Sequence, residues 1–193
     1  MMKTIEHKRK LFDIADAQMG YFTTSQAEEA GFKQSNFNVH IKNKNWKKEY
    51  HGIYRLSDYP ITDYEDYMVW YLWSRNRAGI PQGVFSNQTA LSLYNLSEVN
   101  PSKIHLTVPE NFRRSGEIPN ILILYKQNIK EGDKKQFCGF QITTPLKTIL
   151  DVIEQGALSN EFIHQAIVQA DKRGLILKKH FAEFPILKAY AVR

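Results

Sequence analysis

The sequence predicts an α+β protein that is built from two domains. Residues 1–58 hold three helical patterns and then a hairpin pattern, and a proline-containing segment follows at 57–63. From residue 79 onward, short β-type runs alternate with helical patterns, which is typical of an α+β domain. The chain has 193 residues, 42% of them hydrophobic, which is enough to bury two small cores. We therefore predict one domain over 1–58 and a second over 63–193.

The first two helices have recognisable start and stop signals. Apolar residues at helical spacing predict a helix over 7–18, and Gly20 follows it as a stop. Thr23 stands three residues before Gln26, which is the spacing of a capping box. The helix that begins there is expected to end at Gly31.

A third helix and a hairpin complete the first domain. Ser35 is expected to cap a helix that runs to about residue 44. From residue 46 the pattern is strand-like, and 51–52 (His-Gly) can form a two-residue hairpin turn because glycine adopts a positive φ. Three helices followed by a hairpin is the element order of a winged helix-turn-helix.

The second domain is expected to begin with a helix that Asp63 caps and that runs to about residue 76. Near its end, Thr144 is a helix cap, Pro145 takes the first helical position and Gly156 ends the helix. A further helix should start at Ser159. Between these helices, β-type runs predict strands at 83–86, 104–109, 121–125 and 136–143.

Positive charge is concentrated in the third helix and the hairpin. The chain carries a formal net charge of +6 and has a pI of about 9.3. Between Lys33 and Arg55 there are six basic residues and one acid, Glu49, which gives 6 − 1 = +5. Clustered cations attract phosphate more strongly than the same charge spread over a surface, because salt screens distant charges. This clustering favours an acidic polymer as the partner.

The third helix also carries side chains that can bind bases and phosphates. With Phe37 and Ile41 turned inward, asparagine, valine and lysine occupy the outward arc. Asparagine can pair with adenine, valine can contact a thymine methyl group, and lysine can bind guanine or phosphate. The alternative is that a Lys/Asn-rich helix surface is only a solvated face. The DNA-binding residues that we predict are Lys33, Gln34, Ser35, Asn36, Val39, Lys42, Asn43, Lys47, Lys48 and Arg55.

No motif of a catalytic or metal site is present in the sequence. It lacks a glycine-rich phosphate loop, a His-Glu-x-x-His motif and a Gly-x-Ser-x-Gly elbow, and no two of its six histidines stand at i,i+4 spacing. We interpret Asp151 as a structural carboxylate, with no second carboxylate or lysine at catalytic spacing. The single cysteine, Cys138, excludes an internal disulfide and is expected to be buried. We therefore expect no enzyme activity, no cofactor and no metal.

Membrane insertion and secretion are not expected. The sequence has no run of about 18 apolar residues, and no apolar core follows the charged residues near its start. With one cysteine, the composition fits a reducing compartment. We expect a cytoplasmic protein.

Several stretches of both predicted domains are similar to one protein family. The first, "GYFTTSQAEEAGFKQSNFNVHIKNKNWKKEYHGIYRL", resembles the N-terminal winged-helix domain of the AbiE-type antitoxins. At 44–46 the sequence is Lys-Asn-Trp, whereas the family usually has Gly-x-Leu there. In the second domain "FSNQTALSLYNL", "KIHLTVPENFRR" and "ITTPLKTILDVIEQG" are also similar. The family positions matched in the first domain are Gly20, Thr23, Gly31, Gly52, Ile53, Tyr54, Arg55 and Leu56.

The resemblance implies a function in type IV toxin–antitoxin and abortive-infection (phage defence) systems. It implies a C-terminal mixed α/β antitoxin domain and repression of the protein's own operon through inverted repeats in double-stranded promoter DNA. It also implies a nucleotidyltransferase-like toxin as functional partner, opposed without a stable complex. Two alternatives stay open: a C-terminal nucleic-acid-modifying enzyme beside a winged helix, and a protein–protein adaptor.

Overall fold

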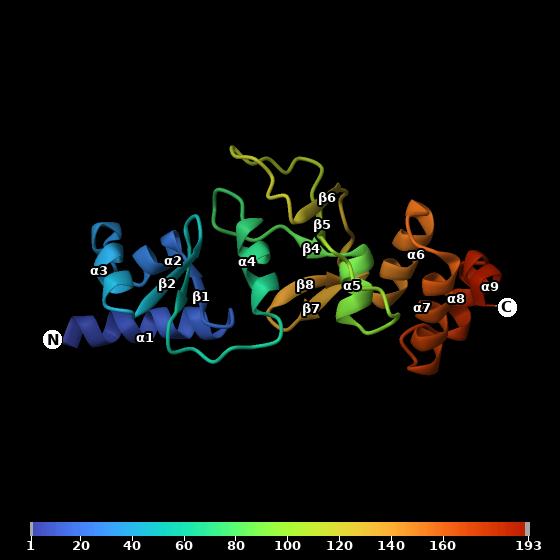
Figure 1. The fold of residues 1–193 in the computed structure, drawn as a ribbon, viewed down its shortest axis with the longest axis horizontal. Helices are drawn as coiled ribbons and strands as arrows, with labels where there is room; N and C mark the ends of the chain where they lie inside the picture. The colour runs from blue at the N-terminus through green and yellow to red at the C-terminus, as the bar shows by residue number, and fades with distance from the viewer. Residues whose placement is uncertain (1, 192–193) are drawn as a thin grey trace. The chain divides into compact units, whose positions relative to one another are not determined.

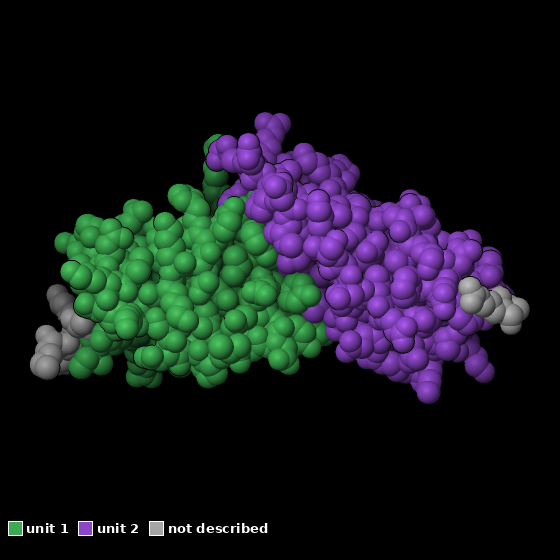
Figure 2. Space-filling view, viewed as in Figure 1, with its two compact units in different colours: residues 1–82, 137–140 green, residues 83–136, 141–193 purple. Residues whose placement is uncertain are grey.

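The computed structural model describes residues 2–191 and divides into two compact units (Figure 2). Unit 1 comprises residues 1–82 and 137–140, and unit 2 comprises residues 83–136 and 141–193. The described residues form nine α-helices and two β-sheets, so the predicted α+β class is confirmed. The segment 57–63, which we expected to link two domains, lies inside unit 1.

Of the first three helices of unit 1, the second follows its sequence signals most closely, whereas the helix predicted over 7–18 spans Met2–Asp16. The Gln26 backbone N–H donates to Thr23 Oγ1 at 3.3 Å and the Thr23 N–H donates to Gln26 Oε1 at 2.8 Å, so the predicted capping box is confirmed. Ser35 does not cap the third helix. It lies inside a 3₁₀ turn, and Asn36 takes the N-cap position without a side-chain hydrogen bond. The elements are α1 (Met2–Asp16), α2 (Thr24–Glu29), η1 (Gln34–Asn36) and α3 (Phe37–Lys42).

A three-stranded antiparallel sheet forms the middle of unit 1 (Figure 1). Its strands are β1 (Tyr21–Thr23), β2 (Trp46–Tyr50) and β3 (Ile53–Leu56), in the order β1-β3-β2. The hairpin β2–β3 was predicted, with Gly52 at a φ of 67° in its turn. The short strand β1 was not, because three residues carry too little periodicity to be recognised.

Both faces of this sheet are covered. Phe22 and Tyr54 belong to a buried cluster with Phe37 of α3 and with Leu11 and Ala15 of α1. The opposite face packs against α4 (Glu65–Trp73), which contacts β1 and β3. This second covering layer explains why the segment 57–63 is part of the unit: it connects a sheet to a helix that packs on that sheet.

Gly20 occupies a position where the backbone and the available space both require glycine. Its φ is 85°, and an added Cβ would lie 2.4 to 2.7 Å from three carbon atoms of the Tyr59 side chain. Gly79 has a similar φ of 80°, but its added Cβ would meet only Ser25 Oγ at 3.7 Å. Gly79→Ala is therefore expected to lower the free energy of unfolding by about 1 kcal/mol and Gly20→Ala by about 3 kcal/mol. Both variants strain the backbone, but only Gly20→Ala also overpacks its surroundings.

Urea denaturation followed by tryptophan fluorescence checks this difference, because Trp46, Trp70 and Trp73 are the protein's three tryptophans and all lie in unit 1. Equal losses for Gly20→Ala and Gly79→Ala would contradict the predicted clash with Tyr59.

A mixed five-stranded sheet has the order β6-β5-β4-β8-β7, and all its strand residues except Phe137 and Phe140 belong to unit 2. Strand β4 is antiparallel to β5 and parallel to β8, and β5 is parallel to β6. The strands are β4 (Val84–Phe85), β5 (Ile104–Val108), β6 (Leu122–Lys126), β7 (Lys134–Phe137) and β8 (Phe140–Thr143).

The run predicted as one strand at 136–143 is a hairpin, and this corrects two expectations. Cys138 and Gly139 separate β7 from β8 with φ values of 45° and 87°. Two successive positive φ angles are the geometry of a tight two-residue hairpin turn. Cys138 is consequently exposed at the turn and not buried.

The helices of unit 2 begin with α5, which contacts β5 and α6. The signals around α6 are confirmed: Thr144 Oγ1 accepts from the Lys147 backbone N–H at 3.4 Å, and Gly156 ends the helix with a φ of 61°. The two last helices were not predicted. The elements are α5 (Asn87–Leu93), η2 (Glu131–Asp133), α6 (Pro145–Gln155), α7 (Asn160–Lys172), α8 (Lys178–Glu183) and α9 (Ile186–Ala191).

No helix of the described residues combines the length and the apolar character needed to cross a membrane. Within the same residues, no three His, Cys, Asp or Glu side chains gather in a way that could hold a metal ion.

Candidate nucleic-acid interface

Helix α3 is anchored by one aromatic side chain and exposes most of its remaining surface. Phe37 is 3% exposed, and its ring lies 5.1 Å from the Trp46 ring and 5.4 Å from the Tyr54 ring. These edge-on contacts fix the rotation of α3 about its own axis. The exposed side, called the α3 surface below, consists of Ser35, Asn36, Asn38, Val39, Lys42 and Asn43.

The α3 surface contains one residue that was not predicted and five of the predicted DNA-binding residues: Ser35, Asn36, Val39, Lys42 and Asn43. Asn38 was missed, although its position one helical turn before Lys42 places it on the same side. Val39 is 54% exposed, so its methyl groups are available for contact with a partner. Three asparagines around an exposed valine give this surface hydrogen-bonding groups and one apolar contact point.

The lysines in and near helix α3 have no neutralising partners among the described residues. Residues 33–48 include five lysines and no acid. None of these lysines forms a salt bridge with any residue in the described range 2–191. All five are exposed: Lys33, Lys42, Lys44, Lys47 and Lys48.

Lys47 and Lys48 lie on opposite faces of the sheet. Lys48 pairs with Tyr54 and Lys47 pairs with Arg55. Directly paired residues share a face, and successive residues of a strand alternate between faces. Since Tyr54 contacts Phe37 of α3, Lys48 lies on the α3 side and Lys47 on the α4 side. The two lysines, which we expected to act together, are separated by the sheet.

Arg55 is the one predicted contact residue that the structure excludes from a surface role. It is 4% exposed, and its Nη2 donates to the backbone oxygens of Tyr59 and Pro60, both at 2.9 Å. The same nitrogen lies 3.2 Å from Glu65 Oε2, and the guanidinium stands over the Tyr21 ring at 5.7 Å. Arg55 therefore holds the segment after β3 and the start of α4 against the sheet. The sequence pattern cannot separate this role from a phosphate contact.

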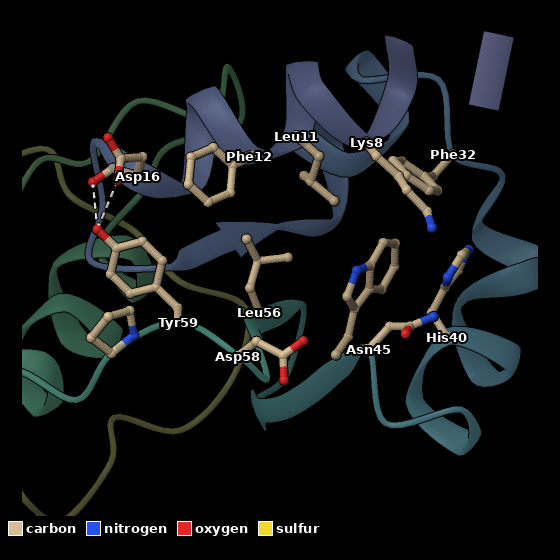
Figure 3. Close-up of a pocket in the computed structure, with 12 residues that line it drawn as sticks. Lys8, Leu11, Phe12, Asp16, Phe32, His40, Asn45, Leu56, Asp58 and Tyr59 are labelled. Carbon is tan, nitrogen blue, oxygen red and sulfur yellow. Dashed lines mark hydrogen bonds between the residues drawn. The ribbon is translucent and has the colours of Figure 1, made fainter. Parts of the chain in front are cut away.

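The other side of α3 borders a groove of about 490 Å³ in unit 1 (Figure 3). Phe12 of α1 and Tyr59 line one end, where the Tyr59 hydroxyl donates to Asp16 Oδ1 at 2.9 Å. His40 and Lys8 line the other end. His40 is turned about 160° from Lys42 around the helix axis, so the groove is separate from the α3 surface.

His40 adds no charge to α3 at neutral pH. Its imidazole stacks on the Trp46 ring, with the centroids 4.3 Å apart. Burial and the nearby Lys8 ammonium lower the pKa of His40 below its usual value near 6.5. The positive charge around α3 therefore comes from lysine.

The interpretation of Asp151 as a structural carboxylate needs one correction. Lys147 lies one turn before Asp151 on α6, and its Nζ forms a salt bridge with Asp151 Oδ1. Burial raises the pKa of Asp151, and the bond from Lys147 opposes that rise. The pair lies in unit 2.

The α3 surface exposes three asparagine amides, one valine and the ammonium group of Lys42, and Lys48 lies on the same side of the sheet as α3. Asparagine side chains both donate and accept hydrogen bonds, as base edges require, while lysines bind phosphates at any sequence. No carboxylate of the described residues pairs with these lysines, so they are available to an anion.

No family model matches the sequence, and no curated protein matches it either. Among solved structures, the chain is similar to the RV2827C protein from Mycobacterium tuberculosis at 11% sequence identity, with a TM-score of 0.47. The similarity covers 86% of this chain and 71% of that one.

Proposed function

We propose that unit 1 contains a winged helix-turn-helix and binds double-stranded DNA through the α3 surface. The observation that carries this proposal is the exposed, unpaired set of lysines around a helix whose outward side chains are amides and one valine. A helix of this kind reads base edges in the major groove, while lysines beside it contact the backbone. Lys48, from the hairpin β2–β3, extends this contact on the α3 side.

The proposed mechanism has two steps. The lysines first attract the duplex without regard to sequence, releasing counterions from the phosphates. Asn36, Asn43 and Val39 then contact base edges, asparagine through its amide and valine through its methyl groups. Affinity should therefore depend strongly on salt, and sequence preference should depend on α3.

We further propose that the protein is an antitoxin that represses its own operon and opposes a nucleotidyltransferase-like toxin. This part rests on the resemblance of both regions of the sequence to AbiE-type antitoxins. The α3 surface supports the repressor role, and unit 2 is the proposed antitoxin domain. The neighbouring gene supplies the toxin in this proposal.

Two experiments test these roles separately. Fluorescence anisotropy with the duplex upstream of the gene should show tighter binding than an unrelated duplex of equal length and base composition. Equal binding of both duplexes would contradict specific repression. Co-expression with the adjacent gene product should restore growth without stable co-purification, and failure to restore growth would contradict the antitoxin role alone.

The separation of Lys47 and Lys48 gives a prediction with an internal control. Lys48→Ala is expected to lower the slope of log affinity against log salt by about 0.9, because one phosphate contact is lost. Lys47→Ala removes the same charge from the α4 side of the same strand and should leave the slope unchanged. Anisotropy titrations between 50 and 200 mM salt measure both slopes. Equal changes in the two variants would show that the α3 side is not the contact face.

A further inference from the structure

Unit 2 contains a cavity of about 530 Å³ whose lining is mostly polar. It is bordered by the start of α5, by strands β5 and β6, and by α6. Its volume lies within the range of sites that bind small molecules. The lining residues that matter below are Asn87, Thr107, Tyr125, Lys126, Asp151 and Glu154.

Asn87 is the unusual residue of this cavity. It is 1% exposed and has a φ of 52°, a conformation that residues other than glycine rarely adopt. Its Nδ2 donates to Ser86 Oγ at 3.1 Å, and Thr107 Oγ1 donates to the same oxygen at 2.8 Å, so the amide is held in place. Asn87 Oδ1 is buried and accepts no hydrogen bond from any residue between 2 and 191. Buried acceptors of this kind are rare and point to a donor from outside the chain.

The α6 side of the cavity adds further acceptors. Asp151 is 7% exposed and is bonded to Lys147. Glu154, nearly one turn later, is exposed and has no ion pair with a described residue. Together with Asn87 Oδ1, these carboxylates suit a ligand that donates hydrogen bonds through an amine or ring N–H group.

The β6 side supplies an aromatic ring and a cation. The Tyr125 hydroxyl is hydrogen-bonded to His105 Nδ1 at 2.8 Å, and the two rings are stacked with centroids 5.7 Å apart, so Tyr125 is rigid. Lys126 is exposed beside it. A planar ring can pack on tyrosine, and an ammonium group can bind a phosphate. Lys126 and the Lys147–Asp151 ion pair make the cavity a poor site for a divalent cation, which needs several unpaired oxygens.

We propose that this cavity binds a nucleoside monophosphate whose base carries an exocyclic amine. The amine donates to Asn87 Oδ1 and to the carboxylates of α6, the base packs beside Tyr125, and the phosphate binds Lys126. No step of this binding involves the α3 surface, so it is independent of the proposed DNA contact.

Isothermal titration calorimetry of the full chain with AMP, GMP, CMP and UMP tests the proposal. At least one of the first three is expected to bind with a Kd of about 100 μM or lower and at least about tenfold more tightly than UMP, which lacks the amine. If AMP, GMP and CMP all have a Kd above about 1 mM, the proposal is overturned. The proposal is also overturned if UMP binds as tightly as the other nucleotides. It is overturned as well if Mg²⁺ alone binds and this binding is lost in Asn87→Gly.

Three variants connect the binding to the named residues. Asn87→Gly keeps the positive φ and should weaken binding at least about tenfold with an unchanged circular dichroism spectrum. Lys126→Ala should remove the difference in affinity between the nucleotide that binds and its nucleoside. Lys130→Ala removes an exposed lysine that does not line the cavity and should leave this difference intact. If Lys126→Ala and Lys130→Ala behave alike, the phosphate is not bound at Lys126 and the proposal fails.

Discussion

Arg55→Met is expected to lower the free energy of unfolding of unit 1 by about 3 kcal/mol, although the residue lies in the most basic part of the sequence. Methionine keeps much of the apolar stem but provides no donor. The backbone oxygens of Tyr59 and Pro60 lose their hydrogen bonds, and Glu65 loses its cation in a largely buried setting. Urea denaturation followed by tryptophan fluorescence measures the loss.

Arg77→Met is the matched control for this substitution. Arg77 is exposed and has no ion pair with a described residue, so the change should stay within about 0.5 kcal/mol. Arg55→Lys should also destabilise, because a single ammonium cannot reproduce the planar guanidinium between two carbonyl groups and a carboxylate. A stable Arg55→Met protein that binds DNA more weakly would instead return Arg55 to the phosphate-contact role.

Val39→Glu is expected to weaken DNA binding by roughly 100-fold without loss of stability, because a carboxylate at the centre of the α3 surface faces phosphates. Val39 is 54% exposed, so the new charge needs no burial in the folded protein. Anisotropy with the upstream duplex at fixed salt measures the effect.

Val168→Glu is the control for charge and chemistry. Val168 lies on α7 in unit 2 and is 41% exposed, so this variant carries the same added charge on an exposed helix position that is not part of the α3 surface. Its affinity for DNA should match that of the unmodified protein. If both variants bind DNA as the unmodified protein does, α3 is not the reading helix. If both lose affinity equally, net charge and not the α3 surface governs binding.

Local sequence signals located most helices, and the structure shows why they were sufficient. A capping box, or a threonine cap followed by proline and a final glycine, acts within one or two helical turns, so α2 and α6 could be bounded without knowledge of the fold. The outward side of α3 was predicted by turning Phe37 and Ile41 inward, and both side chains belong to or pack against the buried cluster of unit 1. Signals of this range could not reveal β1, which exists only because it pairs with β3.

The sequence by itself determined the α+β class, the bounds of α2 and α6 and the outward arc of α3, because each depends on the spacing of neighbouring residues. Tertiary structure alone decided the burial of Arg55, the separation of Lys47 from Lys48 by the sheet and the exposure of Cys138. These depend on which strand pairs with which and on the helix that covers the second face of the sheet. Such contacts join residues far apart in the chain, and no local pattern encodes them.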